Sequence, residues 1–461
     1  MRNLTAKSIL VTGLLALLVA CGGGGGGGIA VQSTSPYPAA PLSCAVADQR
    51  AWLRDFMNDQ YLWFDRQGAP NEAATTMDQY FTSLLYPVVD RYSFSQNTQQ
   101  FLQFFAAGRR TGYGYSLAWA DAAQTILKVR FVEALSPVGM AGLRRGETIV
   151  SIDGFTPAQI VAGANAVVTT VGVPRNFVVR DLAGVQRSFS VNSADFSLSP
   201  VSHNAVLTAT NGARVGYIAY QEFIASGAAA MGAAINSFRA AGVTEVVLDL
   251  RYNGGGSTTQ ARDLASMLGG SRLSGSTFAL FRFNAKYSAN NVAQAFTSNL
   301  QTLPAAPLEN LSRLFVITSG GTASASEMVI NGLRPHLPVI TIGATSFGKP
   351  YGSQPRDACG TTYSAISLEV ANGLGEANFA NGFAPNCAMS DDLTRELGDP
   401  AELRIGAALS YIVNGFCPPV ASVPSNSLTQ ARRAQALGVG RSQDRDDPGF
   451  GEIMLPVLRV D

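Results

Sequence analysis

The stretch that decides the fold is RLFVITSGGTASASEMVINGL, residues 313–333. It begins with a short apolar run that indicates a buried strand, and two glycines, Gly320 and Gly321, follow that run. The segment SASE then leads into a helical pattern. Ser324 and Glu327 have the spacing of a capping box, in which serine and glutamate side chains satisfy amides of the first helical turn. The stretch therefore predicts a strand that passes through a glycine turn into a capped helix.

Apolar strand-like runs alternate with helical runs on both sides of this stretch, between Arg214 and about Pro418. The runs include RVGYIAY, AAAMGAAINSFRAAG, TEVVLDL, TTQARDLASMLG and PVITIG. Such alternation predicts a layered α/β domain of sheet and helices, which we assign to residues 201–420. The polar segment 421–461 is expected to be a loosely ordered C-terminal tail.

Two further regions precede this α/β core. Residues 44–107 show helical spacing of large aromatic side chains, as in RAWLRDFMNDQYLWFDR, and predict an N-terminal helical domain with these aromatics in its core. Residues 108–200 change to short β-type runs separated by turn residues and predict a β-rich domain.

The N-terminus has the build of an export signal. Arg2 and Lys7 precede SILVTGLLALLVA, an apolar stretch too short to span the ~30 Å of membrane hydrocarbon as a helix. We therefore expect residues 1–21 to be a signal peptide. Residues 22–43 are rich in Gly, Ser and Pro, which predicts a flexible tether.

The end of this signal, LVAC, resembles the bacterial lipoprotein signal, in which the cysteine becomes the lipidated N-terminus. The resemblance implies lipidation at Cys21 and a membrane partnership through that anchor. Because Gly22 follows the cysteine, it also implies the outer membrane of the bacterial cell envelope, facing the periplasm or the cell surface. The alternative is a cleaved soluble export signal with an incidental cysteine.

Four cysteines remain in the mature chain: Cys44, Cys359, Cys387 and Cys417. An even number in an exported protein predicts disulfides, and three connectivities are possible. Cys359 and Cys387 bracket one strand-like segment, whereas Cys44 and Cys417 lie near the ends of the folded part. We therefore favour the pairs Cys359–Cys387 and Cys44–Cys417.

Charge and ligand patterns exclude two function classes. The 33 Lys and Arg residues balance the 32 Asp and Glu residues, so nothing indicates a surface for nucleic acid. No Cys-x-x-Cys spacing occurs, and the only histidines, His203 and His336, are far apart in the chain, so a zinc site is not expected. We predict neither a metal nor an organic cofactor.

Two glycine-rich turns follow strand-like runs in the α/β core: VVLDLRYNGGGS at 246–257, and the opening stretch. Strand ends of open α/β sheets place sites at one crevice, so we expect the two turns to meet. A lysine, Lys349, follows in another glycine turn, TSFGKPYG. A serine needs a base to act as a nucleophile, and burial can lower the proton affinity of a lysine enough to serve.

Within the β-rich region, GYGYSL followed by LSPVGMAGLRRGETIVSIDGF resembles a PDZ domain of the kind found in bacterial proteases. The resemblance implies that the loop of Gly112, Tyr113, Gly114 and Tyr115 binds a peptide carboxylate with its amides. The strand after that loop would pair with the extended peptide.

The motifs VVLDLRYNGGGS, TASASEMVINGL, TSFGKPYGSQ and GFAPN, in this order after the PDZ-like segment, resemble the C-terminal processing (tail-specific) serine peptidases. The resemblance covers roughly residues 45–415. It implies that Ser324 is the nucleophile and Lys349 the general base, a variant of the catalytic triad. The amides of Ala325 and Gly255 would form the oxyanion hole.

Two positions either admit a second interpretation or depart from the family pattern. The resemblance makes Glu327 a supporting residue, although its capping role explains it equally well. Family members commonly carry a glutamine four residues after the lysine, but Ser353 occupies that position here and Gln354 follows it. This departure puts the hydrogen bond that orients the lysine in question and leaves the Ser-Lys pair intact.

Together these patterns predict a lipid-anchored serine endopeptidase that cleaves unfolded or C-terminally tagged envelope proteins, with polypeptides as its partners. One alternative is a catalytically inactive, lipid-anchored peptide-binding protein of the same fold. Another is an acyl hydrolase of small esters, against which the absence of a Gly-x-Ser-x-Gly motif argues. The oligomeric state stays open.

Overall fold

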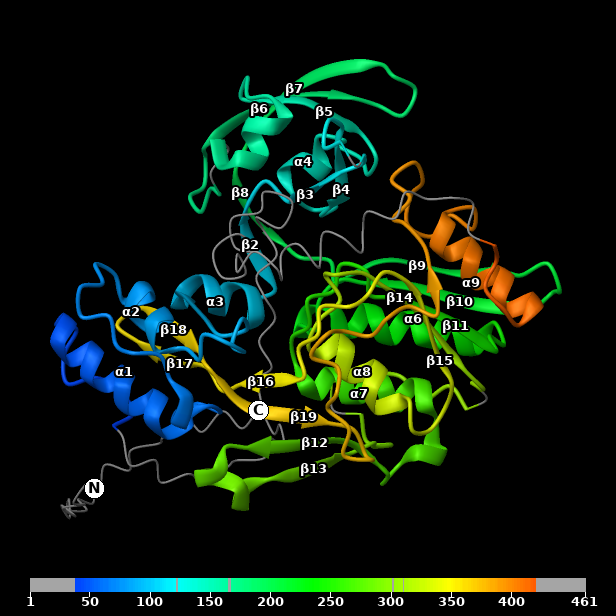
Figure 1. The fold of residues 1–461 in the computed structure, drawn as a ribbon. Coiled ribbons are helices and arrows are strands. Elements are labelled where there is room, and N and C mark those ends of the chain that lie inside the picture. Colours follow the sequence, from blue (N-terminus) through cyan, green and yellow to red (C-terminus); the bar gives the residue numbers. More distant parts are fainter. Residues whose placement is uncertain (1–37, 122, 165–166, 301, 310, 420–461) are drawn as a thin grey trace, which may run out of the picture.

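The computed structural model of the chain describes residues 38–121, 123–164, 167–300, 302–309 and 311–419. Helices near the N-terminus, a separate small sheet domain and a larger α/β body make up these ranges (Figure 1). Cys21, most of the expected tether and the C-terminal tail lie outside the described residues. Within the described ranges, no helix has the length and apolar character needed to cross a membrane.

The α/β body is built on a six-stranded sheet. In spatial order its strands are β20 (Cys387–Ala388), β15 (Val339–Gly343), β14 (Leu314–Thr318), β11 (Glu245–Asp249), β10 (Arg214–Tyr220) and β9 (Val201–Thr208). All pairs are parallel except that of β9 with β10. Every residue of β14 is buried, because both faces of a parallel sheet are covered. Its sequence is accordingly a largely apolar run.

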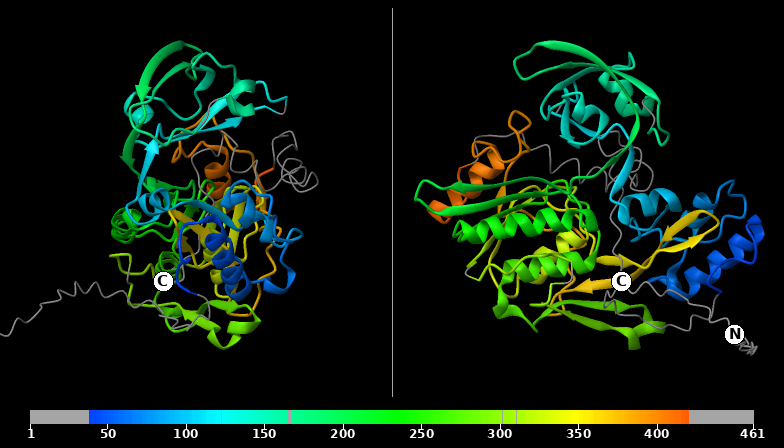
Figure 2. Two further views of the ribbon diagram at one scale, coloured as in Figure 1. Left: turned by 90° about the vertical axis from the view of Figure 1, so that its left-hand side faces the viewer. Right: turned by 180° about the vertical axis from the view of Figure 1, so that it is seen from behind.

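Helices cover both faces of this sheet, as the alternating sequence pattern predicts (Figures 1 and 2). The helices are α6 (Ala228–Ala240), α7 (Thr258–Gly269), α8 (Ala325–Leu333) and α9 (Leu403–Asn414). Val246 and Leu248 of β11 share a core with α6, α7 and α8, whereas Val247 between them packs against α9. Side chains alternate across a strand, so one short apolar run serves both layers. The predicted mixed α/β layering is confirmed.

A four-stranded antiparallel sheet, not expected from the sequence, packs beside this body. Its order is β13 (Val292–Ala295), β12 (Thr277–Phe283), β19 (Ile366–Ala371) and β16 (Tyr351–Ser353). Phe278, Phe281 and Leu368 join the same core as α7 and α8. Short 3-10 turns lie before α6 at η3 (Ala225–Gly227), after α7 at η4 (Ser271–Leu273), and between β12 and β13 at η5 (Ala285–Asn290).

The N-terminal helices do not have a core of their own. They are α1 (Val46–Gln60), η1 (Phe64–Arg66), α2 (Met77–Leu84) and α3 (Thr98–Phe105). Strand β1 (Phe94–Asn97) lies between α2 and α3. Strand β1 pairs with the hairpin of β17 (Arg356–Ala358) and β18 (Thr361–Ser364). Trp52 and Phe81 pack against Tyr363 of that hairpin, so residues 44–107 share their core with a segment of the α/β body.

The predicted disulfide pairing, Cys359–Cys387 and Cys44–Cys417, is wrong. Cys44 is bonded to Cys359, and Cys387 to Cys417, with Cα atoms 5.6 and 5.4 Å apart. Cys359 lies at the tip of the β17–β18 hairpin, which folds back onto the N-terminal helices and so reaches Cys44. Cys387 lies on the edge strand β20, near the end of α9 where Cys417 follows.

A five-stranded antiparallel sheet forms the separate domain at the top of Figure 1. Its strands pair in chain order: β3 (Tyr115–Trp119), β4 (Leu127–Val132), β5 (Thr148–Ile152), β6 (Pro174–Arg180) and β7 (Gln186–Asn192). Three short helical segments accompany it, α4 (Pro137–Met140), α5 (Pro157–Gln159) and η2 (Ile160–Ala164). The strands β2 (Arg109–Gly112) and β8 (Ala194–Ser197) pair with each other and connect this domain to the rest.

Candidate active site

Three turns meet at one edge of the six-stranded sheet. Strands β11, β14 and β15 are parallel neighbours, so their carboxyl ends lie at the same edge. The turns that follow them carry Asn253, Ser324 and Lys349, respectively. The two glycine-rich turns therefore lie at one sheet edge, as predicted, with the lysine turn beside them, and we refer to this meeting of the three turns as the crevice.

Main-chain hydrogen bonds tie the three turns together. Asn253 O accepts from Ala323 N at 3.1 Å and from Ser326 Oγ at 3.0 Å, which joins the first turn to the second. Thr322 O accepts from Phe347 N at 2.9 Å and joins the second turn to the third. The site is thus held by backbone groups rather than by mobile surface side chains.

Ser324 occupies an unusual backbone conformation at the start of α8. Its φ is 58° and its ψ is −115°, a region that costs a non-glycine residue about 1–3 kcal/mol and that is found mainly at functional sites. The side chain is 1% exposed, and its Oγ makes no hydrogen bond with any described residue. The strand-to-helix turn therefore presents a buried hydroxyl with its hydrogen-bonding capacity unused.

Glu327 connects the serine turn to the lysine turn. Its fully buried carboxylate accepts from the main-chain nitrogens of Ser324 and Lys349 at 3.1 and 2.8 Å, both on Oε2. Its Oε1 accepts from Ser346 Oγ at 2.5 Å and Gly348 N at 2.7 Å. Because the main-chain nitrogens of Ser324 and Lys349 bind the same oxygen atom, Glu327 holds the serine turn next to the lysine turn.

These four hydrogen-bond donors also bear on the protonation state of Glu327. Ser346 Oγ accepts a hydrogen bond from Phe383 N, so its own proton is directed to the glutamate. Burial raises the pKa of the Glu327 carboxyl, and the hydrogen bonds from Ser346, Lys349, Gly348 and Ser324 oppose that rise. A group that meets only donors serves as an acceptor, which is the role of an ionised carboxylate.

Lys349 is 2% exposed, and burial lowers the pKa of its amine from 10.5 to about 8. Loss of hydration disfavours the ammonium form, while the negative charges of Asp90 and Glu327 partly restore it. The amine is therefore neutral in an appreciable fraction of molecules near neutral pH. Its predicted hydrogen bond with Ser324 Oγ is not formed in this structure, since Ser324 Oγ has no partner among the described residues.

The two predicted oxyanion donors differ in their hydrogen bonding. Ala325 is the first residue of α8, where helix amides point away from the helix without an internal partner. Gly255 N instead donates to Asn253 Oδ1 at 2.8 Å, so this amide is already occupied in this structure. The asparagine side chain closes the glycine turn on itself and occupies that amide. Its neighbour Gly254 N makes no hydrogen bond within the described part of the chain.

The predicted helper Gln354 does not orient the lysine in this structure. It is partly exposed and makes no hydrogen bond with any described residue. Ser353, which stands where the family pattern has its glutamine, is 1% exposed, and its Oγ also lacks a partner in the described ranges.

The structure adds residues that sequence reasoning missed. Tyr92 Oη donates to Gly348 O at 2.8 Å, and Arg91 Nη2 donates to Phe347 O at 2.8 Å, so the N-terminal region holds the lysine turn from outside. Asp90 fixes this segment by accepting from Tyr61 Oη at 2.6 Å. The only local signal is the charged cluster DRYS at 90–93 within an aromatic region.

The loop of Gly112, Tyr113, Gly114 and Tyr115 joins β2 to β3, and Gly114 and Tyr115 line one pocket together with Tyr252, which precedes Asn253. Gly114 has a φ of 81°, and an added Cβ would lie 2.0 Å from Ser136 Cβ, so only glycine fits there. The ring of Tyr113 is buried in the core of the five-stranded sheet, and its hydroxyl donates to Val173 O at 3.0 Å.

Known proteins resemble this chain over most of its length. Residues 214–382 match the model for Peptidase family S41. A carboxyl-terminal-processing protease of Synechocystis sp. is 28% identical over 358 residues, which cover 75% of this chain and 77% of the relative. A carboxyl-terminal-processing protease of Picosynechococcus sp. is 25% identical, with 65% and 70% covered.

One solved structure has a similar fold. It is a crystal structure of a Bacteroides fragilis protein provisionally described as an S41 protease, with a TM-score of 0.64 and 25% identity. The match covers 79% of this chain and 97% of that chain.

Together these matches support a serine-type peptidase, and residues 214–382 are the part that matches Peptidase family S41. Carboxyl-terminal-processing proteases are among its homologues.

Proposed function

We propose that the chain is an endopeptidase in which Ser324 attacks a peptide bond and Lys349 acts as the general base. The observation that carries this proposal is the shared Glu327 carboxylate, which accepts the main-chain amides of both residues. One rigid acceptor thus fixes the serine turn against the lysine turn. The strained backbone of Ser324 and the lowered pKa of Lys349 support the same pairing of nucleophile and base.

The reaction begins when neutral Lys349 Nζ removes the proton of Ser324 Oγ as that oxygen bonds to the substrate carbonyl carbon. The carbon–nitrogen bond then breaks, and the ammonium returns its proton to the leaving amine. Water, deprotonated by the same amine, hydrolyses the resulting ester and restores the serine. Catalytic hydrogen bonds are often long or absent without substrate, so we expect the contact between Oγ and Nζ to form as the substrate binds.

The oxyanion of the tetrahedral intermediate would be stabilised by two amides. Ala325 N–H lies at the amino end of α8, where the helix dipole also favours negative charge. The second donor in our proposal is Gly254 N–H, because the Gly255 amide is occupied by Asn253. One such donor contributes about 3–4 kcal/mol to the lowering of the barrier.

The five-stranded domain is proposed to capture the substrate in the manner of a PDZ domain. Among the described residues, strand β3 pairs only with β4 and lies at the edge of its sheet, so it offers one side for pairing with an extended peptide. The loop from Gly112 to Tyr115 precedes this strand directly. Together with the names of the relatives, this supports unfolded or C-terminally tagged polypeptides as substrates.

We further propose that the protein is a lipoprotein of the bacterial envelope, anchored through Cys21. The support is the sequence LVAC and the two disulfides, which form in exported proteins. Growth with a radiolabelled fatty acid should label the wild-type protein and not the Cys21→Ser variant. Equal labelling of both would remove the anchor from the proposal.

Incubation of the purified protein with unfolded casein tests the function directly. We expect casein fragments to appear and a peptide-ester adduct on Ser324 to be detected by mass spectrometry after rapid acid quenching. A protein that binds casein and leaves it intact would instead be a peptide-binding protein of the same fold.

A further inference from the structure

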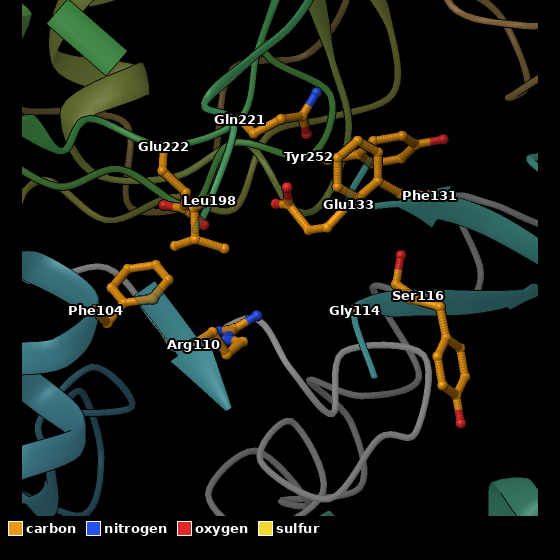
Figure 3. A pocket seen from close by; sticks show the side chains of 11 residues that line it. Phe104, Arg110, Gly114, Ser116, Phe131, Glu133, Leu198, Gln221, Glu222 and Tyr252 are labelled. Carbon is orange, nitrogen blue, oxygen red and sulfur yellow. The ribbon is translucent and has the colours of Figure 1, made fainter. Parts of the chain in front are cut away.

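A pocket outside the catalytic crevice lies where three parts of the chain meet (Figure 3). The first wall comes from β3 and β4 of the five-stranded domain, and the second from α3 and β2. The third comes from the α/β body, through Gln221 and Glu222 after β10 and Tyr252 after β11. The pocket thus lies between the domain proposed to capture substrate and the body that carries Ser324.

Glu222 is the unusual member of this pocket. Its side chain is 8% exposed, and within the described part of the chain its carboxylate forms no ion pair and accepts no hydrogen bond. Burial raises the pKa of the Glu222 carboxyl well above its ordinary value, Arg110 lowers it, and Glu133 raises it further. A buried acid without a bonded partner is costly unless a ligand supplies one.

The remaining groups favour a cationic ligand. Two carboxylates, of Glu222 and Glu133, face the pocket against the single guanidinium of Arg110, so the lining is acidic. Ser116 Oγ is buried, has no partner among the described residues and points into the hollow in Figure 3. Phe131 offers an apolar wall for the methylene stem of a long side chain.

The same pocket is directly connected to the proposed oxyanion turn. Phe223, the residue after Glu222, donates from its N to Gly255 O at 2.8 Å and accepts at its O from Ser257 N at 2.8 Å. On the opposite side, Ser116 belongs to the edge strand β3. A peptide that pairs with β3 and continues toward the glycine turn would therefore pass this pocket.

We propose that the pocket binds a lysine or arginine side chain of the polypeptide substrate, with Glu222 as the residue that selects for positive charge. The inference rests on the proposed peptidase function and adds a specificity-determining residue to it. Glu222 contacts the side chain of the bound peptide and takes no part in bond cleavage.

The test uses short fluorescein-labelled peptides in which a single lysine is moved along the sequence, each with a twin that carries norleucine instead. Binding is measured by fluorescence anisotropy on the Ser324→Ala protein, and kcat/KM by chromatography on the wild-type protein. At one lysine position we expect lysine to be preferred over norleucine about tenfold in both measurements, the size of one hydrogen bond to a charged group.

The Glu222→Gln variant should reduce this preference to less than about twofold. Glutamine has nearly the same shape and replaces a buried carboxyl group by a neutral amide, so the variant should melt no lower than the wild type. The exposed substitution Asp55→Asn, which changes the net charge equally, should keep the full preference. A preference that survives Glu222→Gln, or no preference at any position, would overturn the proposal.

The two proposals fail in different ways. A wild-type protein that cleaves peptides without regard to lysine position retains the peptidase function and loses the charge-selective pocket. A wild-type protein that cleaves nothing contradicts the peptidase function, and the anisotropy measurements still decide whether Glu222 binds a cation.

Discussion

The crevice at Ser324 and the pocket at Glu222 each contain a buried glutamate, and the two glutamates are held very differently. Glu327 in the crevice receives four hydrogen bonds, three of them from main-chain amides. Glu222 in the pocket receives none within the described residues. The carboxylate of Glu327 is part of the hydrogen-bonded structure of the site, whereas that of Glu222 is left to bind a ligand. Burial alone therefore does not separate structural from ligand-binding acids, but the count of their donors does.

The largest expected effect belongs to the crevice. Ser324→Ala and Lys349→Met should each lower kcat on unfolded casein by at least about 10⁴-fold, since nucleophile and base act as one unit. Lys349→Met should not lower the melting temperature. Burial in the folded protein disfavours the charged form of Lys349 and lowers its pKa to about 8, so the charged lysine does not stabilise the fold. Activity that persists in either folded variant would contradict the assignment.

A second, smaller effect is expected for the framework carboxylate. Glu327→Gln should lower kcat about 10²-fold and destabilise the protein by about 2–4 kcal/mol, since an amide cannot accept from all four donors. Chemical denaturation and casein cleavage measure the two effects. The comparable change Glu369→Gln affects a partly exposed ion pair with Arg282 and should be nearly neutral. Equal effects at both positions would mean that Glu327 is not the link between the turns.

The disulfides sharpen the comparison at the level of whole regions. Cys359→Ser opens a bridge between residues 315 apart in the chain, whereas Cys417→Ser opens one between residues 30 apart. In the chain-entropy account, a disulfide that closes a longer loop stabilises the protein more, so we expect losses of unfolding free energy of about 6 and 4 kcal/mol, respectively. Denaturant titration of both variants measures them. A larger loss from Cys417→Ser would show that the N-terminal helices contribute little to the stability of the body.

The smallest expected effect lies in the five-stranded domain. Gly114→Ala should lower kcat/KM severalfold for long, tail-bearing substrates and leave short peptides unaffected. The reason is the positive φ of Gly114 and the clash of a Cβ with Ser136, which would displace the loop before β3. Gly184→Ala is a suitable control, because its φ is also positive and an added Cβ would meet nothing. Equal losses on short and long substrates would argue against capture by this loop.

Features formed by residues close together in the chain could be predicted from the sequence, whereas contacts between distant residues could not. The strand, glycine turn and helix around Ser324 are local, and the meeting of strand ends follows from the α/β pattern, so both were predictable. The hydrogen bonds of Arg91 and Tyr92 to the lysine turn cross more than 250 positions of sequence and leave no periodic signal. The same holds for the bridge from Cys44 to Cys359.

A different limit applies within the glycine turn. The choice between Gly254 and Gly255 as an oxyanion donor depends on where the Asn253 side chain points, and side-chain direction is not written in the spacing of residues. Likewise, nothing in the local sequence of Glu222 distinguishes it from a surface acid, because the pocket around it is lined by segments that are distant in the chain.

The account depends most on a lysine that is neutral when it meets the serine. The most direct measurement is kcat/KM for one peptide from pH 6 to pH 10. Because only the deprotonated amine accepts the proton, the rate should rise about tenfold per pH unit up to an inflection near 8 and stay level above it. A rate that is flat down to pH 6, or that inflects only near the ordinary lysine value of 10.5, would contradict Lys349 as the base.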